Sequence, residues 1–153
     1  ITFVIVGTGP EKPTLMRLSE RLGVNRKVEF TGYLDDRALA KHYEAASFFI
    51  SPSSAEGFGV AVFEAMAYGL PVIAARLPVY EGLLSHRENA LLFRSGDVDE
   101  IVKYVEMVVQ DTELRDKLSS NGVPFAKEHF SWDIIAKQIA SVYNIVLERH
   151  WSF

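Results

Sequence analysis

Residues 47–75 read SFFISPSSAEGFGVAVFEAMAYGLPVIAA, a pattern that predicts a strand, a helix and a second strand. The apolar run at 47–51 is a short strand that a proline and a polar turn end. The helix is expected from about residue 59 to residue 68, with Gly69 as its C-terminal cap, and the second strand occupies 71–75. Two strands joined through a helix are expected to pair in parallel, with a right-handed crossover.

The same alternation of strand and helix extends on both sides of this stretch. The run ITFVIV at residues 1–6 has no apolar–polar alternation, which suits a strand that is buried on both faces. Four strand–helix alternations predict an α/β fold, a Rossmann-like parallel sheet with helices on both faces. The further elements expected are a helix at 12–22, a second helix that runs through Leu39 and Tyr43 with Asp35 or Asp36 as its N-cap, strands at 28–30 and 90–93, and a short helical piece around 80–84.

Beyond Asp97 the chain is expected to be helical, because apolar residues there recur at helical spacing. Ser131 is the expected N-cap of the last helix. The apolar stripe of that helix begins at Trp132 and is interpreted as core packing. The three stripes consist of Ile101, Val105 and Val108, of Leu114 and Leu118, and of Trp132, Ile135, Ile139, Val142 and Val146.

Composition and charge exclude several classes of protein. With 153 residues, 48% of them apolar and 24% charged, the chain fits one ordinary globular domain. Its net charge is −4 and it has no basic block, so nucleic acid is not expected as a partner. The longest low-charge stretch, 57–75, is interrupted by Glu64, Gly69 and Pro71, so no membrane helix is expected.

The absence of cysteine rules out thiol catalysis, iron–sulfur clusters and zinc sites built from cysteine. It fits a reducing compartment, and a cytoplasmic localisation is expected. The four histidines share no metal-ligand spacing such as H-x-x-x-H, so a metal site is not expected. The chain begins inside an apolar run and without methionine, so it is interpreted as a fragment of a longer protein, cut just before a strand.

The most informative loop is Ser51–Val60, which leaves one strand and opens a helix. Ligands of open parallel sheets bind beyond the carboxyl ends of the strands. The glycines on either side of Phe58, Gly57 and Gly59, leave the amides of Gly59 and Val60 bare at a helix N-terminus. Unpaired N–H groups and the helix dipole at such a position attract a diphosphate.

Two glutamates flank this helix N-terminus. Glu56 places negative charge beside the expected anion, unless it turns away to accept hydrogen bonds from vicinal hydroxyls. Glu64 lies eight residues later, about 12 Å along an ideal helix, in an apolar run where an unpartnered carboxylate is costly. Carboxylates so spaced do not share a proton, but they suit the two ends of an extended ligand, a sugar at one and a ribose at the other. For Glu64, an exposed position or a salt bridge is the alternative.

Two other loops are weaker candidates. Gly7 and Gly9 form a G-x-G that matches G-x-G-x-x-G only in part, because Lys12 stands at the third glycine position. These glycines serve either a tight turn with positive φ or the close approach of a ligand to the backbone. Arg76, in the loop after the strand at 71–75, is a candidate for phosphate contact, with a solvated side chain as the alternative.

The pattern as a whole resembles the donor-binding half of the group 1 retaining glycosyltransferases, a GT-B family that includes sucrose synthases and bacterial glycogen synthases. The resemblance is carried mainly by residues 43–74, YEAASFFISPSSAEGFGVAVFEAMAYGLPVIA. It covers essentially the whole chain. Further matches, in the family's order, are Gly7-x-Gly9-Pro10, Phe30-x-Gly32, Asn89-Ala90-Leu91-Leu92-Phe93 before Gly96-Asp97, and Phe130-Ser131-Trp132.

The resemblance implies that residues 1–153 form the C-terminal nucleotide-sugar donor-binding domain of a hexosyltransferase. Glu56 is then the catalytic residue and contacts the hydroxyls of the transferred sugar, while Glu64 contacts the ribose hydroxyls. Transfer is implied to proceed with retention and without a bound metal or cofactor. The implied partners are the nucleotide-sugar donor and an acceptor such as a glycan or a lipid, and polysaccharide biosynthesis is a family-level expectation. The diphosphate is assigned to the amides around Phe58, Gly59 and Val60.

Two departures limit what is carried over from the family. Many members have a Gly-Gly pair after the fourth strand, where this chain has Arg76-Leu77-Pro78-Val79-Tyr80-Glu81, so contacts assigned to that pair are not transferred. The basic Arg and Lys that neutralise the diphosphate belong to a strand–helix unit expected before residue 1, and the N-terminal acceptor domain is missing too. The chain alone is therefore expected to be inactive as a transferase, and any peripheral membrane association is expected only through the missing domain.

Two other classes of protein are kept as alternatives. A dinucleotide-binding redox domain fits the Rossmann-like alternation, but the second strand closes on Phe30-Thr31-Gly32 and not on an acidic residue. A non-catalytic relative, in which the fold serves as a nucleotide-binding or interaction module, is the second alternative. The presence of both Glu56 and Glu64 favours the enzyme.

Overall fold

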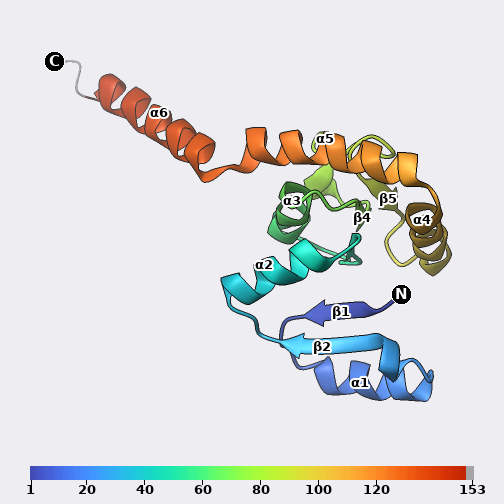
Figure 1. The fold of residues 1–153 in the computed structure, drawn as a ribbon. Coiled ribbons are helices and arrows are strands. Elements are labelled where there is room, and N and C mark those ends of the chain that lie inside the picture. Colours follow the sequence, from blue (N-terminus) through green and yellow to red (C-terminus); the bar gives the residue numbers. More distant parts are fainter. Residues whose placement is uncertain (151–153) are drawn as a thin grey trace. The chain divides into compact units, whose positions relative to one another are not determined.

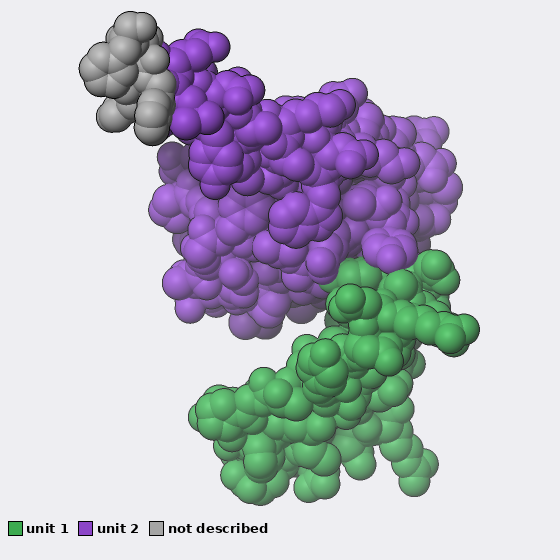
Figure 2. All heavy atoms as spheres, turned by 90° about the vertical axis from the view of Figure 1, so that its left-hand side faces the viewer, with its two compact units in different colours: residues 1–45 green, residues 46–153 purple. Residues whose placement is uncertain are grey.

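The computed structural model describes residues 1–150, and these form an α/β fold (Figure 1). The chain divides into two compact units, residues 1–45 and residues 46–153, which Figure 2 shows in green and purple. Within each unit the strands pair in parallel, as two sheets among the described residues. The predicted parallel α/β fold is confirmed, but the described strands form two sheets where the sequence predicts one.

Unit 1 is built on two parallel strands, β1 (Phe3–Val6) and β2 (Val28–Gly32). Its helices are α1 (Lys12–Arg21), the 3-10 helix η1 (Asn25–Lys27) and α2 (Asp36–Ala45). The side chain of Asp35 caps α2, because its Oδ1 accepts a hydrogen bond from the amide of Ala38 at 2.8 Å. This confirms the predicted N-cap.

The expectation that the first strand is buried on both faces is wrong. The side chains of β1, from Phe3 to Val6, are 41–44% exposed. A strand without alternation is buried only where a layer covers each of its faces. In unit 1 the helix α1 contacts β2. The apolar run therefore predicts the existence of this strand correctly, but it does not predict how far the strand is buried.

Unit 2 has a parallel sheet in the order β3-β4-β5, with Ile50 opposite Ile73 and Ile73 opposite Leu91. α3 connects β3 to β4 and ends at a left-handed glycine, Gly69, as predicted. The helical piece expected around 80–84 is a 3-10 helix that begins earlier, with Pro78 at its start. The elements are β3 (Phe49–Ser51), α3 (Val60–Ala67), β4 (Val72–Ala75), η2 (Pro78–Tyr80) and β5 (Leu91–Phe93).

The core of unit 2 lies around β4, all four residues of which are buried. α3 and α4 both contact this strand, and α5 packs against α3. Gly122 of α5 faces Met66 of α3, and a Cβ added there would make ordinary van der Waals contact, 3.5 Å from Cγ of Met66. The three C-terminal helices are α4 (Val98–Gln110), α5 (Thr112–Phe130) and α6 (Trp132–His150).

The C-terminal helices form where the sequence predicts them, but the last apolar stripe does not pack as expected. The backbone carbonyl of Ser131 accepts hydrogen bonds from the amides of Ile134 and Ile135, both at 3.1 Å, so α6 begins as predicted. Trp132, however, is 83% exposed, and Ile139, Val142 and Val146 also lie exposed. The prediction of core packing is wrong, because helical spacing identifies an apolar face but does not supply an element to cover it. Within residues 1–150, no helix is both long enough and apolar enough to cross a membrane.

Candidate functional site

The loop that follows β3 holds the first predicted site residue, Glu56. Ser51 is buried at the end of the strand, and a proline stops the strand there. The hydroxyl of Ser53 donates a hydrogen bond to Oε1 of Glu56 at 2.7 Å. The Glu56 side chain is exposed, so the carboxylate is oriented by Ser53 and its remaining lone pairs stay available to a ligand.

The N-terminus of α3 follows directly. Gly59 is the N-cap residue, with φ +80 and ψ 43, and no side chain makes a capping hydrogen bond to this helix. Its carbonyl accepts the first helical hydrogen bond, from the amide of Val62 at 3.0 Å. No charged side chain occupies the first turn. The first amide groups of α3 are thus free of a capping partner and can meet an anion, as the sequence predicts.

Tyr80 lies directly beneath Gly59. A Cβ added to Gly59 would collide with the tyrosine hydroxyl and would lie 2.6 Å from Cε1 and 2.8 Å from Cζ. Tyr80 is only 2% exposed. Among the described residues, its Oη is the buried side-chain polar atom that makes no hydrogen bond. Burial raises the pKa of the Tyr80 phenol, the Ser51 hydroxyl opposes this rise, and the Glu56 carboxylate adds to it.

Phe58 ties the loop to two helices. Its ring is 45% exposed, yet it contacts the rings of Phe63 in α3 and Phe130 at the end of α5, with centroids 5.4 Å away in both cases. Phe63 in turn packs against Phe130 with the rings tilted and their centroids 4.0 Å apart, and it meets Tyr80 edge to face with centroids 6.2 Å apart. This cluster fixes the part of the loop between the two glycines, Gly57 and Gly59.

The second predicted carboxylate, Glu64, lies in the second turn of α3 on an exposed position. The ideal-helix spacing of about 12 Å does not apply to this pair of carboxylates, because α3 begins at Val60 and Glu56 belongs to the preceding loop. The structure therefore brings Glu56, Gly57, Phe58, Gly59, Val60 and Glu64 onto one loop and the helix that it opens.

Gly7 and Gly9 lie in unit 1, in the turn that follows β1. Gly7 has φ +121, and its amide donates a hydrogen bond to the carbonyl of Gly32 at 2.8 Å. A Cβ at Gly7 or Gly9 would meet no atom within 4 Å. Gly7 thus needs its conformational freedom for the turn, and the space around both glycines leaves the backbone open to a ligand.

Arg76 and Glu81 follow β4. The amide of Arg76 donates to the carbonyl of Phe93 at 2.7 Å, which joins the loop after β4 to the end of β5. Together with Tyr80, both residues line a cavity of about 40 Å³. This volume suits a water molecule but not a phosphate group, so the cavity does not extend the candidate site.

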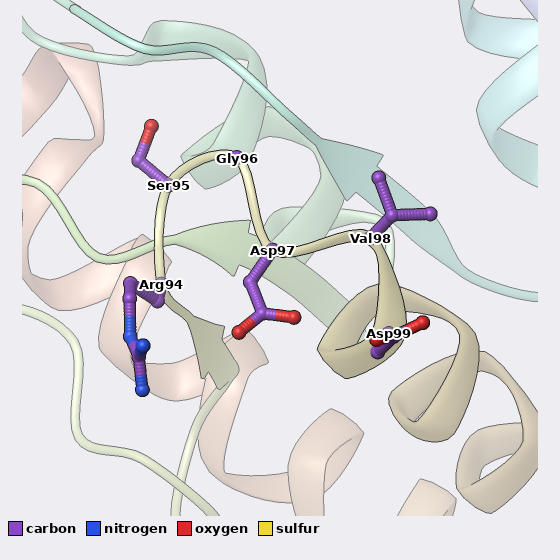
Figure 3. A pocket seen from close by; sticks show the side chains of 6 residues that line it. All are labelled: Arg94, Ser95, Gly96, Asp97, Val98 and Asp99. Atoms are coloured by element: carbon purple, nitrogen blue, oxygen red, sulfur yellow. The ribbon is translucent and has the colours of Figure 1, made fainter.

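A second hollow, of about 470 Å³, lies between β5 and α4 and is lined by Arg94, Ser95, Gly96, Asp97, Val98 and Asp99. In Figure 3 the side chains of Ser95 and Val98 point away from those of Arg94 and Asp97. Asp97 caps α4 by accepting from the amide of Glu100 at 3.0 Å, and Glu100 accepts from the amide of Arg94 at 2.7 Å. The Asp97 carboxylate and the Arg94 amide are thus used to fold the loop between β5 and α4.

Metal ligands do not gather near the loop. In the part of the chain that the structure describes, no three side chains of His, Asp or Glu lie close enough to hold an ion. The expectation that the site uses no metal stays a prediction.

Sequence reasoning did not anticipate two residues of this neighbourhood, Tyr80 and Phe130. Phe130 had a signal in the motif Phe130-Ser131-Trp132, although the motif did not show that the ring reaches Phe58. No sequence motif pointed to Tyr80, because it lies in the segment 76–81, where the chain departs from the pattern of the family.

The uncapped N-terminus of α3 lies at the carboxyl end of a parallel sheet, the place where Rossmann-like domains bind their ligands. The chain matches the family model of group 1 glycosyl transferases over residues 1–123, and it belongs to this family. An uncharacterised glycosyltransferase of Methanocaldococcus jannaschii is 34% identical over 146 residues, which are 95% of this chain and 37% of that protein. The alpha-monoglucosyldiacylglycerol synthase of Acholeplasma laidlawii is 26% identical over 152 residues, 97% of this chain and 36% of that protein.

The fold is also that of solved relatives. HepE of Anabaena in complex with UDP is 28% identical, with a TM-score of 0.86 over 94% of this chain and 41% of HepE. The HepE complex with UDP-glucose has the same TM-score. This likeness confirms the predicted GT-B type of fold. The chain spans from 36% to 41% of the length of these three relatives.

Proposed function

We propose that this chain is the donor-binding part of a retaining glycosyltransferase, which transfers a hexose from a nucleoside diphosphate sugar to an acceptor such as a glycan or a lipid. The observation that carries the proposal is the uncapped N-terminus of α3, where the left-handed Gly59 follows the Glu56 loop. The UDP and UDP-glucose complexes of HepE support a nucleotide-sugar as the ligand class.

The diphosphate is assigned to the first amide groups of α3, around Phe58, Gly59 and Val60. When the bond between the sugar and the diphosphate breaks, negative charge develops on the departing group. Amide groups held at a helix N-terminus stabilise that charge without further reorganisation. Gly59 brings the backbone close to the ligand because it carries no side chain.

The two carboxylates are assigned to opposite ends of the donor. Glu56, held by Ser53, contacts the hydroxyls of the transferred sugar, and it is the residue proposed as catalytic. Glu64, exposed on α3, contacts the ribose hydroxyls. Carboxylates suit both tasks, because an ionised carboxylate accepts two hydrogen bonds from neighbouring hydroxyls.

The remaining parts of the proposal concern the rest of the protein and the first loop. Gly7 and Gly9 are proposed to allow the donor close to the backbone, and the acceptor is bound by a further domain of the same protein. Polysaccharide or glycolipid synthesis is the proposed setting. The whole reaction is proposed to run without a metal ion.

The direct test is an NMR titration of the ¹⁵N-labelled chain with UDP, UDP-glucose, GDP and NAD. We expect saturable shifts of the amides at the start of α3 with a nucleoside diphosphate, and a dissociation constant around 1 mM, about 4 kcal/mol of binding. Binding is expected to be weak because the basic pair of the family is not among these residues. Selective binding of NAD would favour a redox domain, and no response to any nucleotide would favour the non-catalytic interaction module. Micromolar binding would show that the basic pair contributes little.

A further inference from the structure

The hydroxyl of Tyr80 is a buried polar group that the described residues leave without a hydrogen bond. The Ser51 hydroxyl interacts with the phenol and lowers its pKa, but Oη makes no hydrogen bond of regular distance and angle with Ser51 or with any other described residue. An unpaired buried hydroxyl costs free energy, and phenylalanine would fill nearly the same volume without that cost. The presence of tyrosine and not phenylalanine at position 80 therefore requires an explanation.

The position of Oη beneath Gly59 explains why a tyrosine is present. Oη and the adjacent ring carbons occupy the space that a side chain at residue 59 would need. Gly59 is buried above them, in the left-handed conformation that opens α3. The tyrosine ring also meets Phe63 edge to face, and Phe63 contacts the loop residue Phe58. Tyr80 thus packs against the N-cap residue Gly59 and, through Phe63, supports Phe58 in the loop before α3.

We propose that Tyr80 is a positioning residue for the nucleoside diphosphate: it holds Gly59 so that the first amides of α3 point at the anion. This inference rests on the proposed function. The hydroxyl has no accessible surface, so it acts through Gly59 and does not touch the ligand. Rigid support in the free protein favours binding, because less ordering remains to be done when the ligand arrives.

The proposal predicts opposite effects of Tyr80→Phe on binding and on stability. Loss of the oxygen leaves unfilled space under Gly59, so the turn relaxes and ligand affinity falls. The same change removes an unpaired buried hydroxyl, so the fold does not become less stable. A residue with a purely structural role would instead lose stability and affinity together or leave both unchanged.

The experiment compares the 153-residue chain with its Tyr80→Phe variant by NMR titration with UDP and by thermal unfolding. We expect the dissociation constant for UDP to rise at least threefold, the Tm to stay equal or rise, and the Gly59 amide resonance of the free protein to move. Tyr104→Phe is the matched control, since Tyr104 is a buried tyrosine of α4 with a pKa that burial also raises. It should change neither the UDP affinity nor the Gly59 resonance.

A change smaller than threefold in UDP affinity, or a fall in Tm with Tyr80→Phe, would overturn the role of Tyr80 while the proposed function stands. If the unsubstituted chain responds to neither UDP nor GDP, the proposed function fails, and the role of Tyr80 fails with it. If it responds to GDP alone, the same comparison is made with GDP. The titration of the unsubstituted chain therefore separates the two.

Discussion

Gly59 combines two constraints that exclude side chains. Its φ of +80 lies in the left-handed region, and Tyr80 occupies the space of a Cβ. Either constraint by itself is common in loops. Together they place a bare backbone at the start of α3, between the loop that carries Glu56 and the helix that carries Glu64.

At this scale the sharpest prediction concerns the two carboxylates. Glu64→Gln should weaken binding of UDP itself, because a charged hydrogen bond to the ribose is lost. Glu56→Gln should reduce only the additional affinity of UDP-glucose over UDP. A lost charged hydrogen bond is worth roughly 1.5–3 kcal/mol, and the lower end applies to exposed groups such as these.

The two variants are measured by NMR titration with UDP and with UDP-glucose, and each serves as the control for the other. If Glu56→Gln weakens the binding of both ligands equally, the assignment of the two ends of the donor is wrong.

At the level of the elements, the edge strand β5 has a backbone amide that bonds to a side chain and not to another strand. β5 pairs with β4 on one side, and on the other the ring of His86 accepts a hydrogen bond at Nδ1 from the amide of Leu92 at 3.0 Å. This requires the neutral ring. Burial is the largest cause that lowers the pKa of His86, and the charges of Arg76 and Arg87 lower it further.

Acidification is therefore expected to weaken the fold around β5. The unfolded chain binds the His86 proton more readily than the folded chain, so stability is lost as the pH falls from about 6.5 through the lower pKa of the folded state. Urea unfolding at pH 7.5 and at pH 5.5 measures the effect. His86→Gln, whose amide oxygen can accept the same hydrogen bond, should show a smaller loss between the two pH values. An equal loss in both proteins would assign the effect to other groups.

For the whole molecule, the placement of charge predicts that no metal is needed. Metal-dependent phosphoryl chemistry places carboxylates around an ion that contacts the phosphates. Here Glu56 lies in a loop and Glu64 lies on α3, and the described residues contain no cluster that suits an ion. The leaving diphosphate is then stabilised by the amides of α3 and by cations from other parts of the protein.

Transferase activity of the full-length gene product should therefore survive an excess of chelator, and added magnesium should not be required. The assay needs a matched reaction in which the chelator is saturated with calcium, so that ionic effects are equal. Loss of activity that a divalent ion restores would contradict this interpretation of the site.

The strands, the crossover helices and the candidate loop can be predicted from the sequence. Five short apolar runs give the five strands, and the crossover helices follow from apolar spacing and from caps such as Asp35. The loop from Glu56 to Val60 was predicted as the candidate site, because glycines before a helix imply exposed amides. These features depend on neighbours in sequence, which is why local chemistry determines them.

Contacts between distant segments needed the tertiary structure. The exposure of β1 and of Trp132 follows from whether another element covers them, and spacing along the chain carries no such information. The support of Gly59 by Tyr80, 21 positions later, arises because β4 returns beside β3 and brings η2 under the N-terminus of α3. Sequence alone determined which backbone groups are bare, and only the tertiary structure decided which side chain holds them in place.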